Sequence, residues 1–159
     1  MGLVPSALAA KGESSLSFSA AYNEFSLNQD PEPNVHAHGA LFLGEYERGI
    51  NDTLWFHAAA GGGIYDQSIY SANGTIGLTF ALDVLKYIPY LNLGIGTAYL
   101  TGGPVDAGFQ NYIELGLGLE VLYSRTFSYG AMLRYDSFAS DLASYLSIGA
   151  RVTWRWGFF

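Results

Sequence analysis

The sequence predicts an all-β protein, an eight-stranded antiparallel up-and-down barrel that crosses a membrane. Three observations predict it. Apolar and small polar residues alternate along several segments, as they do in strands with two different faces. The 20 glycines and the many Tyr, Phe, Thr and Val residues disfavour helices and favour strands. The small polar face carries too little charge to cover the outside of a soluble barrel.

Six segments alternate clearly, and they cover residues 15–22, 75–83, 91–99, 113–123, 127–136 and 146–158. Two further segments, 35–46 and 54–65, are also predicted as strands, although their alternation is less regular. The phase of the segment 35–46 stays open, because Phe42 conflicts with Leu41 and Leu43, and a β-bulge would explain the conflict. These eight segments make one domain with no linker and no long-period repeat.

Alternation by itself leaves open a lipocalin-like soluble barrel with its apolar face inside. The small polar face of the strands decides between a soluble barrel and a membrane barrel. Its Ser, Gly, Thr and Ala residues suit the cramped interior of a narrow barrel. The large apolar side chains then face lipid, and strands of about 9 to 11 residues can cross a bilayer. The aromatic residues near the predicted strand ends are expected to form two interfacial girdles. A soluble β core filled with aromatic residues is the alternative explanation. The expected girdle residues are Tyr22, Phe25, Tyr65, Tyr99, Phe109, Tyr112, Tyr135, Phe138 and Tyr145 at one end, and Trp55, Tyr87, Tyr90, Tyr123, Phe127, Trp154, Trp156 and Phe158 at the other.

The connections between the predicted strands alternate in length, as they do in outer-membrane barrels. The longer ones are residues 26–34, 66–73, 101–110 and 137–143, and the shorter ones are 47–52, 84–88 and 124–126. Both chain ends then lie on the side of the short turns.

Composition excludes other classes of protein. The 159 residues carry a formal net charge of −7, the wrong sign for a protein that grips nucleic-acid phosphates. The absence of cysteine is compatible with passage through an oxidising compartment. Residues 1–12 are expected to be a flexible N-terminus, and 13–159 the barrel domain. Leu3–Ala10 is similar to the tail of a secretory signal, the alternative being an ordinary N-terminus.

From residue 13 to 159 the chain resembles the small eight-stranded outer-membrane barrels of the OmpA transmembrane and OmpX type. The last strand carries the resemblance, since its apolar positions end in Trp154, Trp156, Phe158 and the terminal Phe159. These residues are similar to the aromatic-ended signal that the outer-membrane assembly machinery reads, although the alternation runs through Phe158 rather than the last residue. The resemblance implies an integral protein of the bacterial outer membrane, in contact with the lipid bilayer, lipopolysaccharide and that machinery, and monomeric.

If the apolar faces point outward, seven charged side chains point into the lumen: Asp83, Glu114, Glu120, Arg134, Asp136, Arg151 and Arg155. Buried charges need partners. The tight turn at 124–126 places Glu120 opposite Gly130, which is small enough to let the carboxylate reach Arg151 on the next strand. Glu114 is diagonal to Arg134 across the same hairpin. We expect these ions to plug the lumen, the alternative being a gated narrow path.

The function predicted is a non-enzymatic one, structural or interaction-mediating, in the cell envelope. A narrow channel for small or apolar solutes is the first alternative, and an enzyme that modifies outer-leaflet lipids is the second. For an enzyme, His36 and His38 near one rim and Asp136 with Ser137 near the same rim are the candidates. No His-x-Ser pair of the lipid A deacylase type occurs in the chain. No cofactor is expected, nor a metal site, because His57 is the only other histidine.

Overall fold

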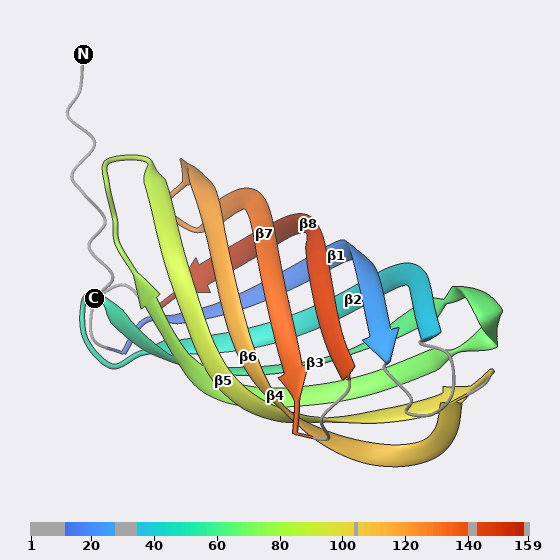
Figure 1. Cartoon of the computed structure of the whole chain (residues 1–159). Coiled ribbons are helices and arrows are strands. Elements are labelled where there is room, and N and C mark those ends of the chain that lie inside the picture. The colour runs from blue at the N-terminus through green and yellow to red at the C-terminus, as the bar shows by residue number, and fades with distance from the viewer. Residues whose placement is uncertain (1–11, 28–34, 104, 140–142, 158–159) are drawn as a thin grey trace.

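Eight antiparallel strands pair in sequence order, and the first also pairs with the last, so that the sheet closes into a barrel (Figure 1). The structure is a computed structural model that describes residues 12–27, 35–103, 105–139 and 143–157. The strands are β1 (Ser14–Leu27), β2 (Val35–Gly49), β3 (Leu54–Tyr65), β4 (Tyr70–Ala81), β5 (Tyr87–Gly102), β6 (Val105–Ser124), β7 (Phe127–Phe138) and β8 (Ala143–Trp156). The predicted fold class is confirmed.

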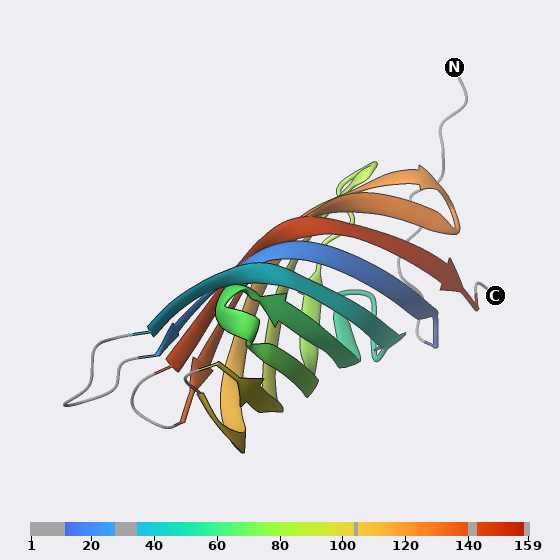
Figure 2. The ribbon, with the colours of Figure 1, turned by 90° about the vertical axis from the view of Figure 1, so that its right-hand side faces the viewer.

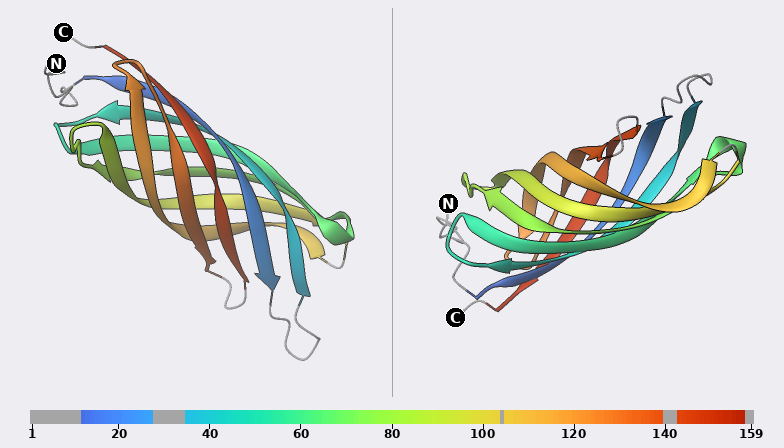
Figure 3. Two further views of the ribbon diagram at one scale, coloured as in Figure 1. Left: turned by 90° about the horizontal axis from the view of Figure 1, so that it is seen from above. Right: turned by 60° about the horizontal axis from the view of Figure 1, so that its bottom comes forward.

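The two ends of the barrel differ. The turns β2–β3, β4–β5 and β6–β7 lie at one end, together with the start of β1 and the end of β8; we call this the turn end (Figures 2 and 3). The opposite end, the loop end, carries a short 3-10 helix, η1 (Asp66–Ser68), between β3 and β4. Within the described ranges, no helix combines the length and the apolarity that a membrane span requires.

The connections at the loop end exceed those at the turn end by less than the sequence predicts. β5 runs on to Gly102 and β6 begins at Val105, and Gly102 and Gly103 adopt positive φ, so the predicted connection 101–110 is mostly strand. β4 begins at Tyr70, inside the predicted connection 66–73. Long, paired hairpin arms satisfy the backbone groups that an irregular loop would leave to solvent.

The phase of β2 is resolved by its pairing. Leu41 and Leu43 point inward and are buried, whereas Phe42 is 55% exposed on the outer wall. The pairing of β2 with both β1 and β3 runs without a register shift, so the predicted bulge is wrong. Register shifts occur instead near the ends of hairpins, between Leu100 and Gly102 and between Leu122 and Ser124.

Apolar side chains cover the outside of the barrel and charged ones fill the inside. Phe18, Ile76, Ile95, Leu117 and Ile148 are each about half exposed or more on the outer wall. A lipocalin-like barrel has the opposite arrangement, so that alternative is wrong for this chain.

Candidate functional site

The candidate site is the barrel interior, where strand alternation brings charged residues of several strands together. Five of the seven predicted lumen residues are at most 3% exposed: Glu114, Glu120, Arg134, Asp136 and Arg151. Arg155 lies closer to the turn end and is partly exposed. Asp83 follows the end of β4, so it belongs to the mouth of the barrel rather than to a strand.

One group of ions, the Arg134 cluster, gathers around that guanidinium. Its Nη2 lies 3.2 Å from a Glu114 oxygen, and its Nε lies 2.9 Å from Asp136. Arg134 also donates from Nη2 to the Tyr112 hydroxyl at 3.2 Å and to Thr75 Oγ1 at 3.3 Å. The diagonal contact between Glu114 and Arg134 that the hairpin geometry predicts is therefore present.

A second group, the Arg151 cluster, lies nearer the turn end. The Arg151 guanidinium forms ion pairs with Glu45 at 3.2 Å, Glu47 at 3.1 Å and Glu120 at 3.0 Å. Arg155 Nη2 approaches the other oxygen of Glu120 to 2.7 Å. Buried charges of both signs thus meet within direct contact, which offsets the cost of removing them from water.

Hydroxyl groups donate further hydrogen bonds to two carboxylates of the Arg151 cluster, those of Glu47 and Glu120. Glu47 accepts hydrogen bonds from Ser15 at 2.8 Å and from Thr79 at 3.1 Å. Glu120 accepts one from Thr153 at 2.8 Å and another from Ser128. The small polar residues of the alternation pattern therefore serve as donors inside the barrel.

Gly130 creates the space that Glu120 needs. The two residues face each other in the β6–β7 register, as the tight turn predicts. A Cβ added at Gly130 would overlap the Leu119 carbonyl oxygen and lie 2.7 Å from the Cα of Glu120. A glycine here lets the neighbouring backbone approach closely while the Glu120 side chain crosses to β8.

Sequence reasoning missed three ionisable residues of the interior. Glu45 was not assigned because the phase of its strand was open, although Leu41 and Leu43 share it, and Glu47 was placed in the predicted connection 47–52 whereas β2 runs on to Gly49. His57 is fully buried, hydrogen-bonded through Nδ1 to Thr79 at 3.2 Å, and its Nε2 is 3.9 Å from Glu114. Fixing the phase of β2 and β3, and extending β2 past residue 46, would have revealed all three.

Five aromatic residues close the loop end of the lumen, and we call them the aromatic cap. They are Phe25, Tyr65, Tyr112, Phe138 and Tyr145, all buried in one apolar cluster. Tyr145 makes ring contacts with three other members at centroid separations of 4.9 to 5.8 Å. Their assignment to an outer girdle is wrong, as it is for the buried Trp55 and Tyr90 at the turn end.

Outward-facing aromatic residues remain at both ends of the barrel. Tyr22, Tyr99, Phe109 and Tyr135 are exposed toward the loop end, and Tyr87, Tyr123, Trp154 and Trp156 toward the turn end. Of the predicted C-terminal assembly signal, Trp154 and Trp156 thus lie on the outer wall. Phe158 and Phe159 lie outside the described residues, as do residues 1–11.

Little free volume remains inside the barrel between the two ionic clusters. A gap of about 10 Å³ separates the Arg134 and Arg151 clusters, bordered by Tyr90, Asn92 and Met132. Such a gap holds about one water molecule at most. The interior is therefore filled with side chains.

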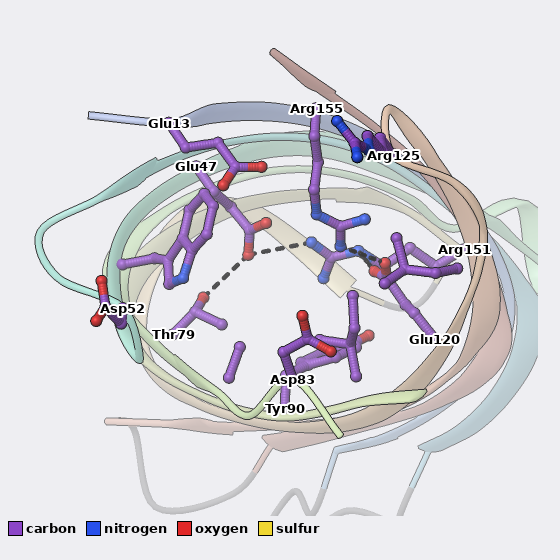
Figure 4. A pocket seen from close by; sticks show the side chains of 14 residues that line it. Glu13, Glu47, Asp52, Thr79, Asp83, Tyr90, Glu120, Arg125, Arg151 and Arg155 are labelled. Atoms are coloured by element: carbon purple, nitrogen blue, oxygen red, sulfur yellow. Dashed lines mark hydrogen bonds and ion pairs between the residues drawn. The ribbon is translucent and has the colours of Figure 1, made fainter. Parts of the chain in front are cut away.

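Below the Arg151 cluster, a recess opens at the turn end of the barrel (Figure 4). It offers a cavity of about 40 Å³ and is bordered by residues from the ends of most strands, Glu13, Asp52, Trp55, Asp83, Tyr90 and Arg125 among them. Burial raises the pKa of the Asp83 carboxyl, and the positive charge of Arg155 acts in the opposite direction.

The residues considered for lipid enzymology do not assemble. His36 and His38 are exposed on the outer wall, and His38 Nδ1 hydrogen-bonds the Tyr22 hydroxyl at 2.7 Å. Asp136 points into the lumen and is bound by Arg134. In the part of the chain that the structure describes, no three His, Asp or Glu side chains are placed to hold a metal ion.

Comparison with known proteins identifies the fold. No family model matches the sequence, and no curated protein sequence is significantly similar to it. Solved structures of eight-stranded outer-membrane barrels match almost the whole chain. Neisserial surface protein A has a TM-score of 0.67 at 18% identity, covering 89% of this chain and 98% of that one. OprG from Pseudomonas aeruginosa has a TM-score of 0.68 at 9% identity, covering 96% and 99%. Ail, the attachment invasion locus protein of Yersinia pestis, has a TM-score of 0.54 at 18% identity, covering 91% and 99%.

Proposed function

We propose that this chain, which has the fold of the small outer-membrane barrels, is an integral protein of the bacterial outer membrane with a lumen closed to ions and solutes. Its role is then structural or interaction-mediating rather than catalytic. The observation that carries the proposal is the filled interior, in which an aromatic cap and two ionic clusters follow one another along the axis.

The outer wall supports the membrane location. Its exposed Phe, Ile and Leu side chains would be costly in water and favourable in acyl chains. The closed sheet has no unpaired edge strand around its circumference, which hydrocarbon would penalise. Migration on a detergent gel tests this, since a membrane barrel refolded in detergent is expected to migrate differently before and after boiling.

The partners proposed are the lipid bilayer, lipopolysaccharide and the assembly machinery, with the protein as a monomer. One feature qualifies the contact with lipopolysaccharide. Leaving aside the buried Asp136, the segments 22–38, 64–72, 97–112 and 137–146, which include the connections of the loop end, contain six Asp and Glu residues and no Lys or Arg. Contact with anionic lipid headgroups would therefore pass through divalent cations rather than through direct ion pairs.

Recording currents across planar bilayers tests the closed lumen. We expect no unitary currents from the unaltered protein, because the side chains of the two ionic clusters and the aromatic cap occupy the lumen along its axis. Arg151→Ala removes the centre of the second cluster and is expected to cost stability, with Arg125→Ala on the β6–β7 turn as the control. Resolved openings of the unaltered protein would favour the narrow channel instead. If Arg151→Ala leaves both the conductance and the stability unchanged, Arg151 does not plug the lumen.

A further inference from the structure

Asp83, Trp55 and Tyr90 border the turn-end recess with polar atoms that lack a hydrogen-bond partner among the described residues, and the Tyr90 ring lies against the Arg151 guanidinium. Both carboxylate oxygens of Asp83 are shielded from solvent, and within the described residues neither has a hydrogen bond or an ion pair. The Trp55 side chain also borders the recess and is only 5% exposed, and its indole N–H has no acceptor there. Buried polar groups almost always have a partner, so the Asp83 carboxylate and the Trp55 indole each call for one.

Several of the other charges around the recess pair with one another. Glu47 binds Arg151, and Glu120 binds both Arg151 and Arg155. In all, five carboxylates border the recess against three guanidinium groups. The excess of negative charge favours a cation at this mouth. Figure 4 shows the Asp83 carboxylate projecting into the open space, across from Glu47.

The size and the donor set of the recess restrict the cation. Its 40 Å³ holds roughly three water-sized groups before the open mouth is reached. A metal ion is not favoured, since the described carboxylates do not converge on one point. The partner that Asp83 lacks is a positively charged donor, and the partner that Trp55 lacks is a neutral oxygen acceptor.

We propose that the turn-end recess binds a small amino alcohol, whose ammonium group donates to Asp83 and whose oxygen accepts from the indole N–H of Trp55. Ethanolamine is the simplest molecule of this class. The Arg151 cluster borders the recess, but the two proposed binding groups, Asp83 and Trp55, belong to neither ionic cluster, so the site does not depend on whether the lumen conducts. A closed barrel and a conducting one can both carry it.

Titration calorimetry on the refolded protein in a non-ionic detergent tests the proposal at about pH 8, where carboxylates are ionised. The probes are ethanolamine, propylamine, which lacks the oxygen, and tetramethylammonium, which lacks N–H donors. We expect ethanolamine to bind most tightly and tetramethylammonium most weakly. Equal affinities for ethanolamine and tetramethylammonium would overturn the proposal without any variant, since charge alone would then explain binding.

Two variants assign the contacts. Asp83→Asn is expected to weaken ethanolamine binding by about tenfold or more, because a charged hydrogen bond is lost. Asp66→Asn removes the same charge at the loop end and should leave binding unchanged. Trp55→Phe should abolish the preference for ethanolamine over propylamine while propylamine still binds. The difference between unboiled and boiled migration verifies that each variant is folded. Unchanged ethanolamine affinity in folded Asp83→Asn would refute the site.

The same chemistry exists free in solution and in the headgroup of phosphatidylethanolamine. Nanodiscs of phosphatidylethanolamine and of phosphatidylcholine separate the two sources. Weaker binding of free ethanolamine in the first lipid means that the headgroup competes and is the natural occupant. Equal binding in both lipids assigns the site to the free molecule.

Discussion

Arg151 holds together the larger ionic cluster, and its removal gives the most informative stability measurement. Its side chain is 3% exposed, and those of Glu45 and Glu47 are 8% exposed. Among the described residues, Arg151 is the only cation within 4 Å of either of these two glutamates. Glu120 differs from them, because Arg155 remains 2.7 Å away when Arg151 is absent.

Arg151→Met keeps the length of the side chain and removes its charge. The change leaves Glu45 and Glu47 as buried anions without a counter-ion. Breaking a buried ion pair from one side costs about 3 to 5 kcal/mol. Because Glu120 keeps Arg155, we expect a total loss within this range rather than a multiple of it. Arg155→Met is the matched control and should cost less, since Glu120 then keeps Arg151.

Urea unfolding in lipid vesicles measures the loss, with the folded fraction followed by unboiled gel migration and tryptophan fluorescence. Adding Glu45→Gln and Glu47→Gln to Arg151→Met should recover most of the lost free energy of unfolding, because neutral amides need no counter-ion. A loss below about 1 kcal/mol, typical of an exposed pair, would refute the reasoning, as would the absence of any recovery.

Three further changes test the outer wall, the packing and the mouth. Leu117→Arg, midway along the β6–β7 pairing and 49% exposed on the outer wall, should cost about 2 to 4 kcal/mol of unfolding free energy in lipid. An unchanged stability would mean that this face does not meet lipid. Gly130→Ala should cost about 1 to 3 kcal/mol by overpacking, whereas Gly108→Ala, with no atom within 4 Å of its added Cβ, should cost nothing; similar values for the two would contradict the packing argument. Asp83 has a pKa raised above its ordinary value of 3.8, so the folded state binds its proton more tightly than the unfolded state does. Stability attributable to Asp83 should therefore fall as pH rises from that value through the raised pKa, and Asp83→Asn should remove this part of the pH dependence of urea unfolding. If Asp83→Asn and the unaltered protein have identical pH profiles of stability, Asp83 does not contribute to the pH dependence.

Much of the interior could be predicted from the sequence, because a strand sends successive side chains to opposite faces. That rule places Glu114, Glu120, Arg134 and Arg151 inside the barrel from the sequence alone. The same rule, applied strictly, would also have placed Tyr112, which precedes the outward Ile113, inside the barrel. Its assignment to an outer girdle came from its position near a strand end, a weaker signal than parity.

Other features depend on which strands become neighbours. The segment 35–46 has large apolar residues on both faces, so its alternation defines no phase, and only pairing with β1 and β3 turns Leu41, Glu45 and Glu47 inward. The cap likewise draws Phe25 from β1 and Tyr145 from β8 into contact at 5.1 Å. The sequence by itself determined the strands and the side of each that carries charge, since those are local properties. Barrel closure decided that Arg151 meets Glu45 and Glu47 and that Phe25 meets Tyr145, because each of these pairs joins residues more than a hundred positions apart.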